Sequence, residues 1–421
     1  MEKKKIYNVN DDVPAKLLIP LALQHTFAMF GASVLVPILF GINPGIVLLM
    51  NGIGTLLFIL ITKGKAPAYL GSSFAFLAPG IAIIQSQGFE YAQGAFVVVG
   101  LLGCLLSYLI YKRGTDWIDV VLPPAAMGAV VALIGFELAG NTVTGGSIGA
   151  NLMTDTAAAA DWIVFLVTLM TAFLGSIMFR GFFSTIPILI AIIVGYIVSI
   201  FFHQVDFTPV MEAKFFTLPD FHMAKFSAEA IFAMLPVILV IAAEHISHQV
   251  VTSNIVGKDL IKDPGLHRSI FADNISTAIS GFVGGVPTTT YGENIGVMAI
   301  TGVYSVKVIG TAAIISILMA FIGPLSALIS TIPGNVIGGV TFLLYGMIGT
   351  SGIRLLVDQQ VDYSRSDNLI LTSVVFIAGL SGLTVQFGSI ELSGMVLSSV
   401  IAVILSLMIH LIKKSGLSNL E

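Results

Sequence analysis

Long apolar stretches separated by short polar segments make up most of the chain. A helix needs roughly 20 apolar residues to cross the hydrocarbon core of a bilayer. By this measure the pattern predicts twelve membrane-spanning helices, at 17–40, 44–62, 93–111, 122–139, 160–179, 185–202, 230–250, 269–285, 305–330, 333–350, 369–385 and 391–412. The first stretch is longer than the core of a signal peptide and has no obvious cleavage site, so we expect it to be retained.

Two further apolar segments, Ser72–Gln85 and Glu293–Tyr304, are too short and too rich in Gly, Ser and Pro to cross as ordinary helices. Irregular backbone is tolerated at membrane depth only where other protein or a watery cavity satisfies its polar groups. We interpret both segments as broken half-helices, each preceded by a short extended strand. As spans 3 and 10 they raise the count to 14, and the expected fold class is an all-α polytopic membrane protein.

The distribution of basic residues supports 14 spans, because short cytoplasmic loops are enriched in Lys and Arg. With a cytoplasmic N-terminus, the inner segments hold all 19 basic residues except Lys214 and Lys225, which lie in the longest loop. A twelve-span alternative places Lys112, Arg113 and Arg180 on the wrong side. We therefore expect a multi-pass protein of the cytoplasmic (inner) membrane with both termini in the cytoplasm.

The second half of the chain resembles the first. The matching positions are Gln24-His25 with Glu244-His245, the short segment around Phe74 with that around Glu293, and Pro123 and Gly128 with Pro333 and Gly338. Seven spans per half is an odd number, so the second copy enters the membrane from the opposite face. An inverted repeat of this kind is typical of secondary transporters, whose site lies at the repeat interface near the bilayer midplane.

Composition excludes several other classes of protein. With 56% hydrophobic and only 10% charged residues, the chain has too little polar surface to be a soluble globule. The net charge of -4 is spread along the sequence and gives no support for nucleic-acid binding. The single cysteine, Cys104, excludes an intrachain disulfide. No P-loop motif is present, and we expect no enzymatic activity and no cofactor.

Two acidic residues, Glu244 and Glu293, lie at membrane depth, where a charge is costly and therefore marks a candidate functional site. His248 follows Glu244 by four residues, so both share one helix face and the imidazole is expected to hydrogen-bond the carboxylate. His245 points elsewhere on the helix. The alternative for Glu244 and His248 is a structural pair between helices.

The site predicted from these residues combines two kinds of group. Carboxylates accept N–H hydrogen bonds, and the free amides at the start of a half-helix donate to carbonyl oxygens. A flat, neutral ligand with alternating N–H and C=O groups suits both, and Phe74 could add an apolar wall and a main-chain donor. Because protonation of buried carboxyls responds to ligand occupancy, proton symport is the simplest coupling hypothesis, with Glu244, His248 and Glu293 as candidates.

Two rival functions remain to be distinguished. An intramembrane zinc protease would need His-Glu-x-x-His or its inverse, whereas this chain has Glu244-His245-x-x-His248 with no third ligand evident, so we expect no metal site. A passive channel would show uptake that is insensitive to a proton gradient and does not saturate at low substrate concentration.

Several strings resemble the bacterial uracil permease branch of the nucleobase-ascorbate transporter family. These are residues 243–256, 263–269 and 289–301, together with Gln24-His25 and Gly71–Phe76. The similarity runs from about Pro20 to Lys414, and the Glu293-Asn294-Ile295-Gly296 string with Thr301 is specific to the family.

The resemblance implies a core domain (17–120 and 230–331, spans 1–4 and 8–11) and a gate domain (121–229 and 332–413, spans 5–7 and 12–14), with uracil held between them. Glu244 and Glu293 would bind the ring, and His248 would bond Glu244. The backbone amides of Phe74 and Gly292 would meet the uracil carbonyls. Ser73, Tyr291 and, from the gate side, Tyr345 are the remaining implied site residues.

The same resemblance implies a homodimer through the gate domains. It also leaves one alternative substrate class open, the purines xanthine and urate. Purine-transporting relatives commonly carry Gln where Glu293 stands, so the acid at this position favours a pyrimidine.

Overall fold

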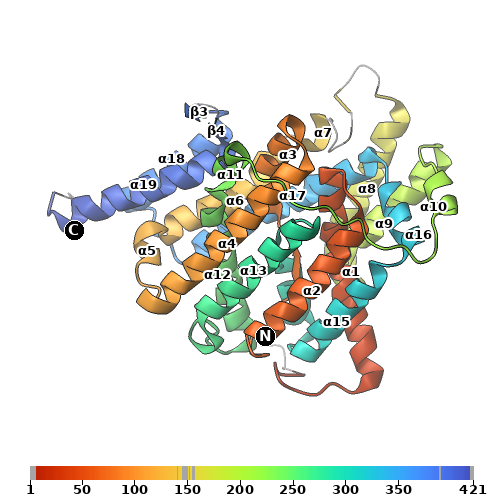
Figure 1. Cartoon of the computed structure of the whole chain (residues 1–421), viewed down its shortest axis with the longest axis horizontal. Coiled ribbons are helices and arrows are strands. Elements are labelled where there is room, and N and C mark those ends of the chain that lie inside the picture. Colours follow the sequence, from red (N-terminus) through yellow and green to blue (C-terminus); the bar gives the residue numbers. More distant parts are fainter. Residues whose placement is uncertain are drawn as a thin grey trace.

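The computed structural model of the protein describes residues 6–139, 141–144, 150, 152–153, 157–387 and 390–417 (Figure 1). The α-helices of the first half are α1 (Ala15–Phe40), α2 (Pro44–Ile61), α3 (Leu77–Ser86), α4 (Phe89–Arg113), α5 (Ile118–Val121), α6 (Pro124–Ala139), α7 (Asn141–Thr144), α8 (Ala159–Met178), α9 (Pro187–Phe201) and α10 (Thr208–Glu212). Those of the second half are α11 (Ala228–Met234), α12 (Val237–Val256), α13 (Leu266–Val283), α14 (Gly292–Thr301), α15 (Val306–Met319), α16 (Gly323–Ser330), α17 (Gly334–Asp358), α18 (Ser366–Leu380) and α19 (Gly394–Lys414).

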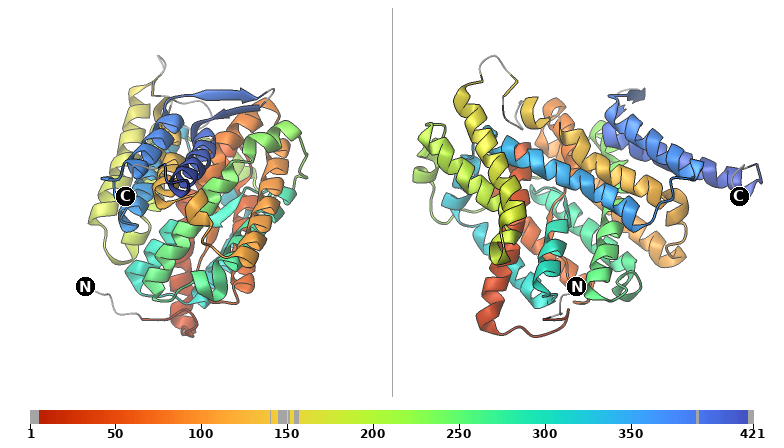
Figure 2. Two further views of the ribbon diagram at one scale, coloured as in Figure 1. Left: turned by 90° about the vertical axis from the view of Figure 1, so that its left-hand side faces the viewer. Right: turned by 180° about the vertical axis from the view of Figure 1, so that it is seen from behind.

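Four short strands complete the fold, together with a few tight helical turns. The strands are β1 (Leu70–Ser72), β2 (Thr288–Thr290), β3 (Thr384–Phe387) and β4 (Ile390–Ser393). The 3-10 turns are Phe74–Phe76 and Gly181–Thr185, and a π turn spans Ile261–Gly265. Strands β3 and β4 form an antiparallel hairpin beyond the end of α18, and β4 contacts α11 (Figures 1 and 2).

Each of the 14 predicted segments coincides with a helix or a pair of helices, so the polytopic helical fold is confirmed. Seven helical stretches in the described residues have the length and composition to cross a membrane. Two expected spans are interrupted. The span predicted at 230–250 breaks at Leu235–Pro236 into α11 and α12, and the span at 305–330 divides into α15 and α16.

Helix packing follows the expected repeat. When the 14 segments are counted in chain order, α2 (second) packs against α15 (eleventh), and α4 (fourth) packs against α13 (ninth), which is the same contact with the halves exchanged. The contact of α8 with α17 likewise matches that of α18 with α6. The fifth and twelfth segments, α6 and α17, are equivalent in the repeat and pack against each other, which agrees with a two-fold relation between the halves.

The short strands that precede the two half-helices pair with each other in the interior. β1 and β2 pair antiparallel with Leu70 opposite Thr290, Gly71 opposite Thr289 and Ser72 opposite Thr288, and all six residues are buried. The amide of Ser73 donates to Pro287 O at 2.8 Å and extends the pairing by one bond. The two broken segments thus satisfy each other's backbone groups, which allows extended chain at membrane depth.

We expect Gly71→Ala to destabilise this strand pair. A Cβ at Gly71 would lie 2.4 Å from ring atoms of Tyr291, and overpacking of this kind costs about 1–3 kcal/mol. The measurement is the thermal unfolding midpoint of the purified protein in detergent. Gly296→Ala in α14 is the matched control, because nothing lies within 4 Å of its added Cβ. Equal midpoints for the two variants would contradict the close packing of Tyr291 on β1.

Candidate functional site

The half-helix α14 presents its N-terminus directly after β2. Its first amides have no carbonyl partner within the helix, and the helix dipole adds partial positive charge at that end. Gly292 opens the helix and its backbone is exposed, while Tyr291 before it donates its amide to Tyr69 O at 3.2 Å. The opposite half-helix begins similarly, with Phe74 following the β1 strand and Ser73. Each of the paired strands therefore leads into a half-helix, and the first backbone amides of both half-helices can serve as hydrogen-bond donors.

The structure brings Glu244 and Glu293 into one region. Glu293 is the second residue of α14, and its carboxyl interacts with its own backbone amide. The Glu244 carboxyl, on α12, lies within electrostatic range of the carboxyls of Glu293 and Asp273, with the Thr289 side chain beside it. Glu244 Oε2 is buried and has no hydrogen-bond partner among the described residues. An unpartnered buried carboxyl oxygen can accept a hydrogen bond from a ligand N–H.

The hydrogen bond expected between His248 and Glu244 was wrong. His248 Nδ1 instead bonds the Thr290 hydroxyl at 3.1 Å. The cause is the strand that precedes α14, because β2 packs against α12 and brings the Thr290 hydroxyl within hydrogen-bonding distance of the imidazole. The other ring nitrogen, Nε2, faces the start of α14 and lies 3.5 Å from where a Cβ on Gly292 would stand.

The aromatic residues predicted for the site have different environments. The rings of Phe74 and Tyr345 meet edge to face, with centroids 6.2 Å apart, and both side chains are buried. Tyr345 Oη and Ser73 Oγ have no hydrogen-bond partner in the described part of the chain. The Tyr291 hydroxyl, by contrast, donates to Ser72 O at 2.8 Å. The side chain of Tyr291 therefore holds β1 in place, and its hydroxyl also lies within electrostatic range of Glu293 and Glu244.

Two buried contacts were missed from the sequence. Asp273 of α13 pairs with His245, whose Nδ1 lies 3.1 Å from Asp273 Oδ2, and Asn294 Oδ1 accepts a hydrogen bond from Nδ1 of His25. Asp273 could have been identified as a candidate from the sequence, since it falls inside the predicted span 269–285 and is an acid at membrane depth like Glu244. His245 thus has a partner on a neighbouring helix, and that partner lies within electrostatic range of Glu244.

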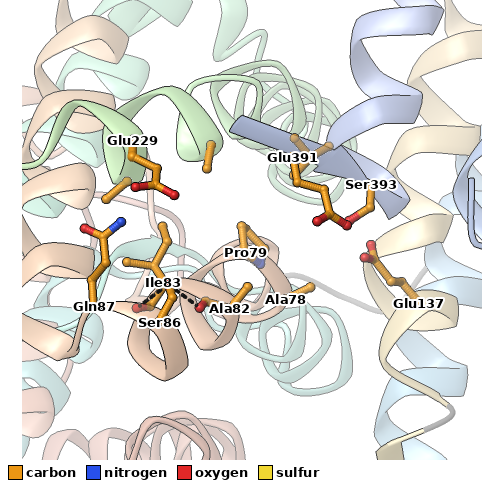
Figure 3. Close-up of a pocket in the computed structure, with 13 residues that line it drawn as sticks. Ala78, Pro79, Ala82, Ile83, Ser86, Gln87, Glu137, Glu229, Glu391 and Ser393 are labelled. Atoms are coloured by element: carbon orange, nitrogen blue, oxygen red, sulfur yellow. Dashed lines mark hydrogen bonds between the residues drawn. The ribbon is translucent and has the colours of Figure 1, made fainter. Parts of the chain in front are cut away.

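A cavity of about 350 Å³ opens away from these residues, between α3 and α11 on one side and α6 and β4 on the other (Figure 3). Three carboxylates line it, those of Glu137, Glu229 and Glu391. Glu137 Oε2 accepts the amide of Met395 at 2.8 Å, at the start of α19. None of the residues predicted for the site lines this cavity, so it is a separate space at the ends of the helices.

Comparison with known proteins identifies relatives along the whole chain. The model of the permease family matches residues 16–388. A uracil permease of Paenibacillus larvae is 52% identical over 99% of this chain and 100% of its own length. A uracil permease of Escherichia coli K12 is 53% identical over 97% of this chain and 95% of its own, and one of Bacillus subtilis is 44% identical over 100% and 99%.

Solved structures of similar fold are anion transporters of low sequence identity. The transmembrane domain of the cyanobacterial bicarbonate transporter BicA aligns with a TM-score of 0.65 at 15% identity, covering 94% of this chain and 99% of that one. The murine anion transporter Slc26a9 in its inward-facing state aligns with a TM-score of 0.67 at 10% identity, covering 98% and 69%. At such identities the likeness concerns the fold alone.

Proposed function

Because this chain belongs to the permease family and is similar over nearly its full length to bacterial uracil permeases, we propose that it imports uracil by proton symport. It is a multi-pass membrane protein and a transporter rather than an enzyme. The single observation that supports the site most strongly is the approach of Glu244 and Glu293 at the N-terminus of α14.

Uracil has two ring N–H groups and two carbonyls, and the proposed site matches both. The carboxyls of Glu244 and Glu293 accept the N–H groups, and the amides of Phe74 and Gly292 donate to the carbonyl oxygens. The rings of Phe74 and Tyr345 supply an apolar contact to the heterocycle. Backbone amides at a half-helix start need no reorganisation to receive a carbonyl, which favours a rigid planar ligand.

Proton coupling is proposed from the crowding of acids. Glu244 lies within electrostatic range of both Asp273 and Glu293, and like charges in a low-dielectric site repel strongly. Placing a proton on one acid of this cluster removes part of that repulsion, and a neighbouring carboxyl still offers an oxygen to a ligand N–H. Uracil binding and proton binding are thereby linked, and His248, which extends from α12 toward the start of α14, is the third candidate for the proton.

Alternating access is proposed to occur between a core domain (17–120 and 230–331) and a gate domain (121–229 and 332–413). Within the first group α2, α4, α13 and α15 pack on one another, and within the second α6, α8, α17 and α18 do so. The site lies where the groups meet, since Phe74 contacts Tyr345. The cavity of Figure 3 also separates the groups, which suits a route that opens and closes as they move.

We place the protein in the cytoplasmic membrane with both termini inside, as the positive-inside pattern favours. We also propose a homodimer through the gate domains. Exposed apolar side chains on α17, including Phe342 and Met347, offer a surface for it. Cross-linking of the protein in native membranes tests the dimer, and labelling of cysteines added at each terminus tests the orientation.

Competition of labelled uracil uptake into vesicles by a nucleobase panel tests the function. We expect unlabelled uracil to compete, xanthine and urate not to compete, and accumulation to disappear when the pH gradient is collapsed. Competition by xanthine would favour the purine alternative. Uptake that neither saturates nor responds to the gradient would instead indicate a channel.

We expect Thr290→Val to impair transport through His248. The variant removes the hydroxyl that fixes Nδ1 of the imidazole while preserving side-chain shape, so the ring loses the bond that sets its tautomer and orientation. The expected result is a shifted pH profile of uptake, rescued by Thr290→Ser. Thr288→Val is the matched control, since its hydroxyl bonds Ser276 at 2.8 Å. A pH profile unchanged in Thr290→Val would refute this role.

A further inference from the structure

The connection between α9 and α11 carries an unusual surface. Its only helix is the short α10, and from there the chain crosses the outer surface of the helices to α11 (Figure 1). Large apolar side chains along it are 38–77% exposed: Phe207, Met211, Phe215, Phe216, Leu218, Phe221, Met223 and Phe226. We propose that this segment, residues 207–226 and here called the edge strap, lies against the lipid of the bilayer interface.

The backbone of the edge strap bonds inward to the helix ends beneath it. The amide of Thr217 donates to Phe321 O at 3.0 Å, and Phe215 O accepts the amide of Gly323 at 3.0 Å. Further along, the amides of His222 and Lys225 donate to Val283 O at 3.2 Å and Glu90 O at 2.9 Å. Irregular backbone beside lipid requires such satisfaction by protein, and the edge strap has it at both ends.

Its charged side chains, among them Glu212 and Lys214, are exposed, and two of them also bond to the protein. Asp220 Oδ2 accepts from Asn43 Nδ2 at 2.9 Å, and Lys225 forms an ion pair with Glu90. A contiguous apolar surface in water is unfavourable, whereas exposed apolar and charged side chains next to one another suit the boundary between acyl chains and water. The edge strap therefore suits that boundary.

The exposed apolar surface continues onto helices that face lipid. The ring of Phe216 stacks on Phe321 with centroids 5.5 Å apart and planes 3° from parallel, at the junction of α15 and α16. On α15 itself Leu318 is 63% exposed, and on α9 Phe201 is 77% exposed. α10 packs on α16 and joins these two surfaces. Continuity with the lipid-facing helices identifies lipid as the occupant.

Tryptophan fluorescence with lipids brominated on their acyl chains tests the proposal. In full-length protein with Trp117→Phe and Trp162→Phe, a single reporter is introduced as Phe215→Trp or Phe221→Trp and the protein is reconstituted in phosphatidylcholine vesicles. We expect brominated lipid to remove most of the emission and aqueous acrylamide to have little effect. Leu318→Trp is the lipid-facing control, and Leu417→Trp, beyond the end of α19 and 81% exposed at that position, is the water-facing control.

Quenching by acrylamide to the level of the Leu417→Trp control, without quenching by brominated lipid, would overturn the proposal. Protection from both quenchers would also overturn it, because it would show that a second copy of the chain covers the segment. If the tryptophan-free background does not fold, a nitroxide on Phe221→Cys in a Cys104→Ser background reports the same contrast through collisions with oxygen and with a water-soluble nickel complex. Neither readout depends on the transported substrate.

Discussion

Glu293→Ala is expected to abolish measurable uracil binding. The substitution removes the carboxyl at the start of α14, and each charge-assisted hydrogen bond contributes about 1.5–3 kcal/mol. It also leaves an enlarged space beside the half-helix. We expect Kd for labelled uracil, measured on purified protein, to rise by at least ~10²-fold, counting the lost bond together with the poorer fit of the ring.

Two controls make that result specific. Glu293→Gln keeps the shape and one acceptor oxygen, so it should bind more tightly than Glu293→Ala and shift preference toward purines. The thermal unfolding midpoint of Glu293→Ala should stay near that of the parent, because the removed carboxyl bonds its own backbone amide and is repelled by the neighbouring carboxyl of Glu244. Parental uracil affinity in Glu293→Ala would remove Glu293 from the site.

Glu244→Gln is expected to separate binding from transport. Glutamine keeps the side-chain shape and an acceptor oxygen, so uracil affinity should stay within about ten-fold of the parent, or ~1.4 kcal/mol. It cannot take up a proton, so accumulation driven by a pH gradient should fall to the level of empty vesicles. Uptake and equilibrium binding are measured on the same reconstituted protein.

His245 provides a comparison on the same helix. His245→Asn removes the partner of Asp273, so we expect it to lower stability as well as transport, whereas Glu244→Gln should unfold at the parental temperature. If Glu244→Gln accumulated uracil against a gradient as the parent does, the proton would have to be carried elsewhere in the site.

Much of the fold could be predicted from the sequence. The length of each apolar stretch indicates a membrane-spanning helix, and the positions of Lys and Arg indicate which loops are cytoplasmic. The two broken spans were recognisable from their Gly, Ser and Pro content. The β3–β4 hairpin was not recognisable: the first half of β3 and most of β4 were assigned to the ends of the spans at 369–385 and 391–412, since alternation in four-residue strands is too short to separate from an apolar helix.

The site was only partly predictable for a different reason. Glu244 and Glu293 were identified because an acid at membrane depth is rare, and the structure brings them together. The partner of His248 could not be read from helix spacing, because it depends on the register that sets Thr290 beside α12. The pairing of His245 with Asp273 likewise depends on how α12 meets α13. Contacts between different helices and strands depend on how these elements pack. The spacing of residues along one helix carries no information about that packing.

Determining the structure with uracil bound tests the proposed site most directly. We predict density for one pyrimidine ring between the carboxyls of Glu244 and Glu293, with a carbonyl oxygen at the amide of Gly292 and the Phe74 ring against the heterocycle. A ring bound elsewhere, for example in the cavity lined by Glu137, Glu229 and Glu391, with the two acids left unoccupied, would contradict it.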